Sequence, residues 1–245
     1  TGESYEVTPL SYLLEAVEIC KEFFPHIGLE IHPLEEDEYR KLFCAGADSV
    51  TIYQETYDRE RYAEVHLAGK KRDYDFRCHT PERAARAGMR RISLGILLGL
   101  SDVAEDLFAL FSHLKHMEKH FPGVDYSLSF PRLRKIKGRD FALCDVDDIA
   151  FIKIICLARI FFPRLGINLS TREKPRLRDH AIELGVTRLS AGSNTSVGGY
   201  SLEAPEEQDP QFDIADDRSL EEIRAMLKEK NFDPVLTDWR RIENK

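Results

Sequence analysis

Several apolar segments of this chain end in side chains that can carry charge or form directional hydrogen bonds. Residues 49–57 begin as the β-branched run of a buried strand and continue with Gln54, Glu55 and Thr56. Polar residues end the apolar segments 126–132, 167–173 and 187–193 in the same way. A carboxylate can accept bonds from two vicinal hydroxyls, and an arginine can clamp a carboxylate. The pattern therefore predicts an enzyme with a binding face built from several strand ends.

The elements that position these strand ends alternate along the chain. Apolar and β-branched runs predict strands at Leu29–His32, Val50–Tyr53, Arg91–Leu98, Tyr126–Phe130, Ile167–Ser170 and Val186–Ser190. Apolar residues at helical spacing predict helices at Pro9–Phe24, Glu36–Ala45, Pro81–Ala87, Asp102–Phe121, Val146–Phe162, Pro175–Leu184 and Leu220–Glu229. The expected capping residues are Thr8, Thr80, Ser101, Asp145 and Ser219.

This alternation predicts an α/β fold with parallel strands and right-handed crossovers. Polar groups at the carboxyl ends of parallel strands are typical of a (β/α) TIM-type barrel, which has eight strands. We expect an incomplete barrel of about six βα units, with the first two strands missing before Thr1; an open doubly wound sheet is the alternative. Residues 1–199 are expected to form the partial barrel. Residues 200–245 are expected to form an acidic loop, a C-terminal helix and a tail packed on it.

Composition restricts the possible functions. The net charge of −8, with both signs interspersed, argues against a nucleic-acid-binding surface. The hydrophobic content of 42% suffices for a core, and no run has the length of a membrane span. The five cysteines include no C-x-x-C pair and are interpreted as reduced thiols. Together with the lack of a segment resembling a signal peptide, they predict a cytoplasmic location.

A set of short motifs makes the chain resemble a known family. The motifs are YQETY (53–57), HLAGKK (66–71), TPER (80–83), AGMR (87–90), SFPRL (129–133), LSTRE (169–173), SAGS (190–193) and GGY (198–200). In this order they resemble the 2-iminoacetate synthases, the tyrosine lyases of thiazole (thiamine) biosynthesis in the radical S-adenosylmethionine (SAM) superfamily. The resemblance covers Thr1 to about Trp239, almost the whole chain, and its specificity lies in the combination.

The resemblance implies a lyase that uses SAM and a [4Fe–4S] cluster to cleave the Cα–Cβ bond of L-tyrosine into 2-iminoacetate (dehydroglycine) and p-cresol. The C-x-x-x-C-x-x-C cluster loop of that family is absent, so no metal ligand is expected in this chain. The cluster cysteines are expected upstream, and the chain alone is expected to be inactive. Implied partners are a thiazole synthase and a flavodoxin or ferredoxin as electron donor; no nucleic acid or membrane is expected.

Two other functions stay open at this point. One is the related tyrosine lyase that matures [FeFe]-hydrogenase, which carries an additional C-terminal cysteine-rich domain; no cysteine follows Cys156 here. The other is a non-catalytic barrel that binds SAM or a partner without chemistry.

The resemblance also implies which residues hold SAM. Glu3 is expected to meet its amine, Glu55 its ribose with Gln54 beside it, and Gly95 its adenine. One of two arginines, Arg72 or Arg77, is expected to bind its carboxylate. The structural alternatives are an exposed terminal Glu3, a turn residue at Glu55, a solvated basic loop at 70–77 and helix–strand packing at Gly95.

Substrate binding is assigned to Arg132, Arg172 and Ser190, which follow three different strands. An ion-pair network at the mouth of the barrel is the alternative for the two arginines. No catalytic residue is assigned. Three histidines, His113, His116 and His120, have the spacing of a metal-binding helix face, but a solvated polar face is the preferred interpretation. His32, at a strand end, is the better candidate for contacting a ligand.

Overall fold

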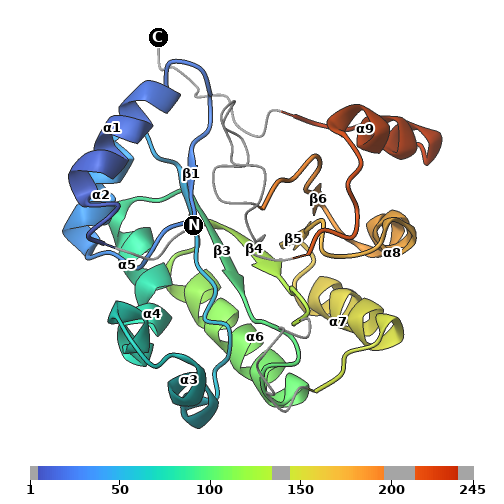
Figure 1. Cartoon of the computed structure of the whole chain (residues 1–245), viewed down its shortest axis with the longest axis horizontal. Coiled ribbons are helices and arrows are strands. Elements are labelled where there is room, and N and C mark those ends of the chain that lie inside the picture. The colour runs from blue at the N-terminus through green and yellow to red at the C-terminus, as the bar shows by residue number, and fades with distance from the viewer. Residues whose placement is uncertain (1–4, 134–143, 196–212, 237–245) are drawn as a thin grey trace. The chain divides into compact units, whose positions relative to one another are not determined.

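The computed structural model describes residues 5–133, 144–195 and 213–236, and it divides into two units. The first unit comprises residues 1–145 with 236–245, and the second comprises residues 146–235 (Figure 1). Each unit is an α/β structure in its own right, so each is described separately.

The first unit alternates strands and helices in sequence order (Figure 1). Its elements are α1 (Leu10–Cys20), β1 (Gly28–Leu29), α2 (Glu36–Ala45), β2 (Ser49–Thr51), α3 (Arg59–Val65), the 3-10 turn η1 (Lys70–Arg72), α4 (Tyr74–Cys78), α5 (Thr80–Ala87), β3 (Arg91–Gly95), α6 (Val103–His120) and β4 (Asp125–Ser129).

The four strands of this unit pair in parallel and in chain order, so each connection crosses over through helices. Val50 of β2 lies opposite Ile92 of β3, which lies opposite Tyr126 of β4. Val50, Ile92 and Leu128 are all at most 1% exposed and form the central layer of the core. Strands buried on both faces are typical of parallel sheets covered by helices.

The second unit contains α7 (Asp148–Phe161), β5 (Gly166–Leu169), α8 (Pro175–Ala181), the 3-10 turn η2 (Ile182–Leu184), β6 (Arg188–Leu189) and α9 (Leu220–Glu229). Strands β5 and β6 are parallel, with Leu169 opposite Leu189. Helix α9 packs its buried Ile223 and Met226 against Ile182, with Leu189 beside them. The final helix therefore belongs to the core of this unit, which explains its amphipathic sequence.

The expected parallel βα units are confirmed, whereas several element ends differ from the prediction. The expected strand Arg91–Leu98 ends at Gly95, beyond which Ile96 and Leu98 form only isolated bridges. Helix α6 is capped by Asp102, which accepts from two backbone N–H groups at 2.9 Å. The expected cap, Ser101, instead donates its hydroxyl to Asp58. A carboxylate at the helix start also interacts favourably with the helix dipole.

Three more of the predicted caps were wrong. Asp147 caps α7 in place of Asp145, because its side chain accepts from the N–H of Ala150 at 2.7 Å. Thr80 lies inside α5 and donates its hydroxyl to the carbonyl of Phe76. Pro9 occupies the cap position of α1 in place of Thr8. Ser219, in contrast, caps α9 through a capping box with Glu222, as expected.

The largest difference lies between β2 and α5. The sequence suggested a solvated basic loop over residues 70–77 as the alternative to a SAM-binding role. The structure instead has three short helical segments, α3, η1 and α4, between residues 59 and 78. Asp58 and Asp73 cap α3 and α4 respectively, each through its carboxylate. Because these helices are only seven and five residues long, they show little apolar periodicity and depend on their caps.

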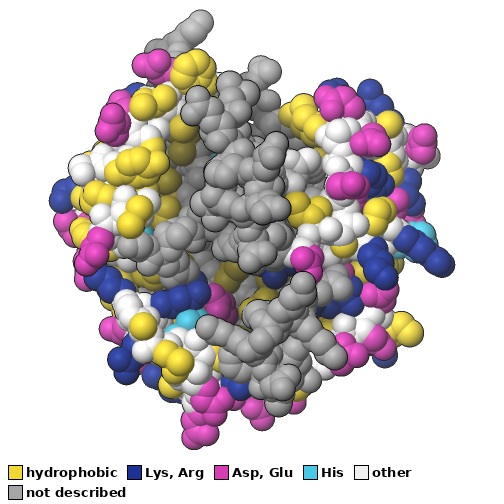
Figure 2. All heavy atoms as spheres, in the orientation of Figure 1, with side chains coloured by type: hydrophobic (Ala, Val, Ile, Leu, Met, Phe, Trp, Pro, Cys, Tyr) yellow, Lys and Arg dark blue, Asp and Glu magenta, His cyan; other side chains and the backbone are white. Residues whose placement is uncertain are grey.

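The exposed faces of both units carry mixed charge. Figure 2 shows dark blue and magenta side chains interspersed over the coloured surface of each unit. In the part of the chain that the structure describes, no helix is both long and apolar enough to cross a membrane.

Candidate functional site

Glu55 sits where the chain leaves β2, and its backbone is held in an unusual conformation. Its φ of 71° lies in the left-handed region, which non-glycine residues seldom adopt. The carbonyl of Glu55 accepts from Leu97 N at 2.7 Å, and a bridge pairs Glu55 with Ile96. Such local strain persists only where the surroundings fix it, and it concentrates at functional sites.

The turn after Glu55 is fixed by Asp106 of α6, which is 3% exposed. One oxygen of Asp106 accepts from the Thr56 hydroxyl at 3.0 Å and from Tyr57 N at 2.7 Å. Burial raises the pKa of Asp106, and these two donors partly offset that effect. The sequence gave no reason to connect Asp106 with this site, because a carboxylate in the first turn of a helix usually serves the helix itself.

Three basic side chains surround the carboxylate of Glu55. Lys71 Nζ lies 2.6 Å from Oε1, His66 Nε2 lies 3.0 Å from Oε2, and the Arg77 guanidinium lies 3.8 Å from Oε1. Burial would raise the pKa of Glu55, but the His66 bond and the Lys71 and Arg77 charges outweigh it and lower the pKa to about 2. Glu55 is therefore an anion over the whole physiological pH range.

The short helices after β2 position these three basic side chains. Residue 66 ends α3, and Gly69, with φ 72°, starts the turn that carries Lys71. Arg77 is 4% exposed and donates from Nε to the carbonyl of Tyr53, so it is anchored to the strand itself. The interpretation as a solvated loop is therefore wrong for Arg77, whereas the side chain of Arg72 is exposed.

Gly95 faces an aromatic ring of the protein. A Cβ on Gly95 would lie 2.6 Å from Cδ1 of Tyr53 and 2.7 Å from the carbonyl oxygen of Ser129. The Tyr53 hydroxyl also donates to Ser129 Oγ at 2.9 Å, which fixes the ring over the glycine. Tight strand–strand packing thus accounts for this glycine, while adenine binding there stays a prediction.

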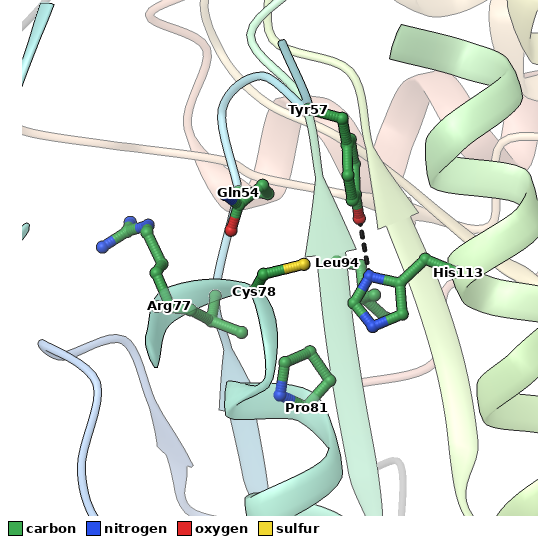
Figure 3. Close-up of a pocket in the computed structure, with 8 residues that line it drawn as sticks. Gln54, Tyr57, Arg77, Cys78, Pro81, Leu94 and His113 are labelled. Atoms are coloured by element: carbon green, nitrogen blue, oxygen red, sulfur yellow. Dashed lines mark hydrogen bonds between the residues drawn. The ribbon is translucent and has the colours of Figure 1, made fainter. Parts of the chain in front are cut away.

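Gln54 lies beyond the end of β2 and is buried. Ile52 and Gln54 line a small cavity of about 10 Å³, roughly the space of one water molecule (Figure 3). Gln54 is 5% exposed, and within the described residues neither atom of its amide has a hydrogen-bond partner. Arg77 also lines this cavity and lies 3.8 Å from Glu55, while a role of Gln54 in SAM binding stays a prediction.

The same cavity is lined by the Tyr57 and His113 side chains, whose Oη and Nδ1 atoms are 2.8 Å apart (Figure 3). Burial lowers the pKa of His113 to about 4 and raises that of Cys78, which also lines the cavity, to about 11. The cavity wall made by these groups is therefore neutral at physiological pH. His113 is a half-buried partner of Tyr57, so the interpretation of its helix face as solvated does not hold at this position.

The remaining predicted residues of the first unit lie in different settings. Arg132 follows β4, is half-buried and forms a bridge with Leu98. His32 is 3% exposed with its ring edge-on to Tyr5, 5.3 Å between centroids. Glu3 falls outside the described residues.

In the second unit, Arg172 and Ser190 follow the neighbouring strands β5 and β6. Arg172 is half-buried, and its backbone N–H donates to Ser170 Oγ at 3.4 Å. Ser190 is exposed and donates its backbone N–H to the carbonyl of Leu169 at 3.2 Å. These two predicted substrate residues are thus brought to the same edge of one parallel strand pair.

Asp216 ties these two strand ends together, and the sequence analysis missed it. Its backbone N–H donates to the carbonyl of Thr171, 3.1 Å away. Its carboxylate pairs with Arg178, which in turn donates to the carbonyl of Ser190. Asp216 and Arg178 are both fully buried. Burial would raise the pKa of Asp216, but its bonds to Arg218 and Arg178 keep the pKa below the usual value.

The chain is similar to several known proteins. A family model described as "Biotin and Thiamin Synthesis associated domain" matches residues 129–233. The 2-iminoacetate synthases of Escherichia coli and Salmonella typhimurium are 39% and 38% identical to the chain over 240 residues, which is 98% of the chain. The chain is homologous to the 2-iminoacetate synthases. It spans 63% of the length of each of these two relatives.

The solved structure of HydG, the [FeFe]-hydrogenase maturase of Carboxydothermus hydrogenoformans, has a TM-score of 0.83 at 36% identity. That match covers 94% of this chain and 53% of HydG. The expected fold class, a partial (β/α) barrel like those of radical SAM enzymes, is therefore confirmed, as is the expected homology to the 2-iminoacetate synthases. The chain is thus similar to both the 2-iminoacetate synthases, at 38–39% identity, and the maturase HydG, at 36%.

The residues of this homologue do not fit an iron–sulfur cluster. All five cysteines are free, and none has the spacing of the cluster loop. Among the described residues, no group of three histidine, cysteine or acidic side chains could hold a metal ion. The described residues therefore offer no site for such a cluster.

The fit to SAM is better, and it rests on Glu55. Each oxygen of this ionised carboxylate is engaged by one donor, which leaves each a further lone pair for a hydroxyl group. The side chain is 22% exposed, so a ligand can reach it. Two oxygens with free acceptor capacity suit the two vicinal hydroxyls of a ribose.

Proposed function

We propose that this chain is the SAM- and substrate-binding part of a radical SAM lyase that cleaves L-tyrosine into 2-iminoacetate and p-cresol for the thiazole of thiamine. Identity of 38–39% to the 2-iminoacetate synthases over almost the whole chain supports the assignment. The observation that carries it is the strained, ionised Glu55 at a strand end, held by the three basic side chains His66, Lys71 and Arg77.

In this proposal Glu55 accepts from the ribose hydroxyls of SAM, and Arg72 or Arg77 meets its carboxylate. The buried anchoring of Arg77 to Tyr53 favours a fixed role for Arg77, whereas the exposed Arg72 is free to move toward a ligand. The cofactor supplies a 5′-deoxyadenosyl radical when it is reduced by a cluster bound elsewhere. The chain's own task is to hold substrate and cofactor in register and to exclude water.

Arg172 and Ser190 are the proposed clamp for the amino-acid substrate, with Arg132 as a further contact. A guanidinium binds a carboxylate at two points, which fixes both the position and the orientation of the Cα substituents. The network around Asp216 supports this proposal, because it fixes the backbone on both sides of the clamp. Thiazole synthase as acceptor of the imine, and a flavodoxin or ferredoxin as electron donor, belong to the same proposal.

A chimera tests the function directly. The 240 matching residues of the Escherichia coli 2-iminoacetate synthase are replaced by those of this chain, and the product is reconstituted with iron and sulfide without oxygen. We expect p-cresol and 5′-deoxyadenosine from tyrosine, SAM and a reductant. Deoxyadenosine that forms without p-cresol, with the unmodified enzyme active in parallel, refutes tyrosine cleavage.

Within the chimera, Arg172→Lys tests the clamp and Arg176→Lys, an exposed arginine of α8, is the matched control. Lysine keeps the charge but loses the two-point geometry. We therefore expect p-cresol to collapse while abortive deoxyadenosine formation continues. If the two products stay coupled at the ratio of the control, Arg172 is not the clamp and Arg132 becomes the next candidate.

The second candidate function is maturation of [FeFe]-hydrogenase, favoured by the similarity to HydG at a TM-score of 0.83. Growth of a thiazole-requiring Escherichia coli strain on the chimera supports the thiamine role. Activation of an [FeFe]-hydrogenase in the absence of its own maturase, without rescue of thiazole synthesis, supports the maturase role instead.

A further inference from the structure

His66 is buried beside Glu55 in a fixed orientation. Its side chain is 7% exposed, and its ring stacks on that of Tyr62 with 4.0 Å between centroids and 30° between planes. Tyr62 is itself 1% exposed and donates its hydroxyl to the carbonyl of Lys71. The imidazole therefore has little freedom to turn away from its two hydrogen-bond partners.

Both ring nitrogens of His66 face atoms that can only accept. Nδ1 lies 2.9 Å from the carbonyl oxygen of Tyr62, and Nε2 lies 3.0 Å from Oε2 of Glu55. A backbone carbonyl has no proton to donate, and neither has an ionised carboxylate. A neutral imidazole carries one N–H and could satisfy only one of these two acceptors. Both contacts can be hydrogen bonds only when both nitrogens carry a proton.

We infer that His66 is a doubly protonated imidazolium that positions the Glu55 carboxylate for ligand binding. Its charge pairs with Glu55 on Oε2, while Lys71 and Arg77 face Oε1. The Nε2 donor fixes the rotation of the carboxylate plane, and the Nδ1 donor fixes the imidazole in turn. The identity of the ligand rests on the proposed function, whereas the protonation state and orientation of His66 do not.

This arrangement makes the site sensitive to pH. When His66 loses the Nε2 proton, that nitrogen presents a lone pair to the carboxylate, so a charge-assisted bond is replaced by repulsion. Loss of the Nδ1 proton instead leaves the Tyr62 carbonyl without its donor. In the first case Glu55 is held by Lys71 and Arg77 on one oxygen only, and its second oxygen is free to rotate. In the second case Nε2–H still donates to Oε2, but the bond loses its charge and the imidazole loses the bond to Tyr62 that orients it. Ligand affinity must therefore fall at a pH at which Glu55, Lys71 and Arg77 all keep their charges.

Nitrogen-15 NMR of the wild-type chain, with its imidazoles labelled, tests the protonation state. The His66 signals are assigned through bonds in the wild-type protein, so that the result does not depend on the folding of a variant. We expect both nitrogens to be protonated near neutral pH, each with a directly bonded hydrogen. One protonated and one bare nitrogen in His66 overturns the inference.

Calorimetric titration with S-adenosylhomocysteine tests the positioning role. Because one charge-assisted hydrogen bond is lost, we expect the affinity of the wild-type chain to fall about tenfold as His66 is deprotonated. His66→Gln keeps a neutral donor toward Glu55 that does not titrate, so its affinity should be intermediate and independent of pH. His116→Gln is the matched control, because this exposed histidine pairs with Glu82 and should leave the pH profile unchanged.

The two experiments separate the inference from the proposed function. If His66 is an imidazolium and no variant binds the nucleoside at any pH, the proposed SAM site fails while the charge state stands. If the nucleoside binds and the His66→Gln profile follows that of the wild type, His66 does not position Glu55 and the inference fails while the proposed function stands.

Discussion

Replacing Asp216 by asparagine should destabilise the second unit more than any surface substitution. The change keeps the shape of the side chain but removes its charge, while Arg178 stays fully buried. Breaking a buried ion pair on one side costs about 3–5 kcal/mol, because the remaining charge is left without compensation. One amide oxygen can still accept a hydrogen bond, so we expect about 3 kcal/mol for Asp216→Asn and more for Asp216→Ala.

Urea denaturation followed by circular dichroism measures this loss. Asp217→Asn is the matched control, since Asp217 is the exposed neighbour and surface substitutions stay within about 0.5 kcal/mol. A second comparison replaces the pair together, as Arg178→Met with Asp216→Leu, which removes both buried charges. We expect this double variant to recover part of the stability lost in Asp216→Asn. Equal stability of Asp216→Asn and Asp217→Asn would refute the reasoning.

Three other predictions concern the first unit and the metal content. Because the pKa of Glu55 is lowered from 4.5 to about 2, its ion pairs stabilise the fold above the unfolded-state value and lose this effect on acidification. Between about pH 5.5 and about pH 3, the wild type should lose about 2 kcal/mol more unfolding free energy than Glu55→Gln in urea titrations; parallel losses would contradict this. Gly95→Ala should cost about 1–3 kcal/mol, because its Cβ meets Tyr53 and the Ser129 carbonyl; an unchanged urea midpoint would show that the strands can separate. Anaerobic reconstitution of the 245 residues should yield no stoichiometric iron, and a stable cluster detected by iron analysis would show that other ligands suffice.

The sequence predicts the parts of this fold that follow from periodicity. Parallel strands and long amphipathic helices are found where the apolar spacing places them, and Ser219 caps α9 as expected. Two of the four helix starts that were wrong, those of α6 and α7, each contain two or more polar residues that can cap. Asp102 rather than Ser101 caps α6 because Ser101 is engaged by Asp58, a residue 43 positions away. Local sequence cannot decide between neighbouring caps when a distant partner determines the choice.

The candidate site shows the same limit. Glu55 could be predicted because a carboxylate follows a buried strand, and strand ends meet on one edge of a parallel sheet. Its partners could not, because His66, Lys71 and Arg77 reach it through three short helical segments that have no periodic pattern. Asp216 is a further example, since Arg178 and Thr171, through which it joins the two strand ends, lie 38 and 45 positions earlier, and only Arg218 is a local partner.

The positive φ of Glu55 explains why this predictable carboxylate depends on partners that could not be predicted. If the strand continued regularly, the side chain of residue 55 would lie on the face opposite Gln54, and the pleat alone would fix the direction of its carboxylate. The left-handed turn at Glu55 removes that constraint on the carboxylate. Two hydrogen bonds hold the turn, from Leu97 N to the carbonyl of Glu55 and from Tyr57 N to the carboxylate of Asp106. The Glu55 carboxylate then needs other groups to fix its direction, and His66 and Lys71 supply one donor to each oxygen. The strained backbone at residue 55 and the three basic side chains therefore act together to fix the carboxylate. A variant that relaxes the turn should make the carboxylate more mobile even with His66, Lys71 and Arg77 in place.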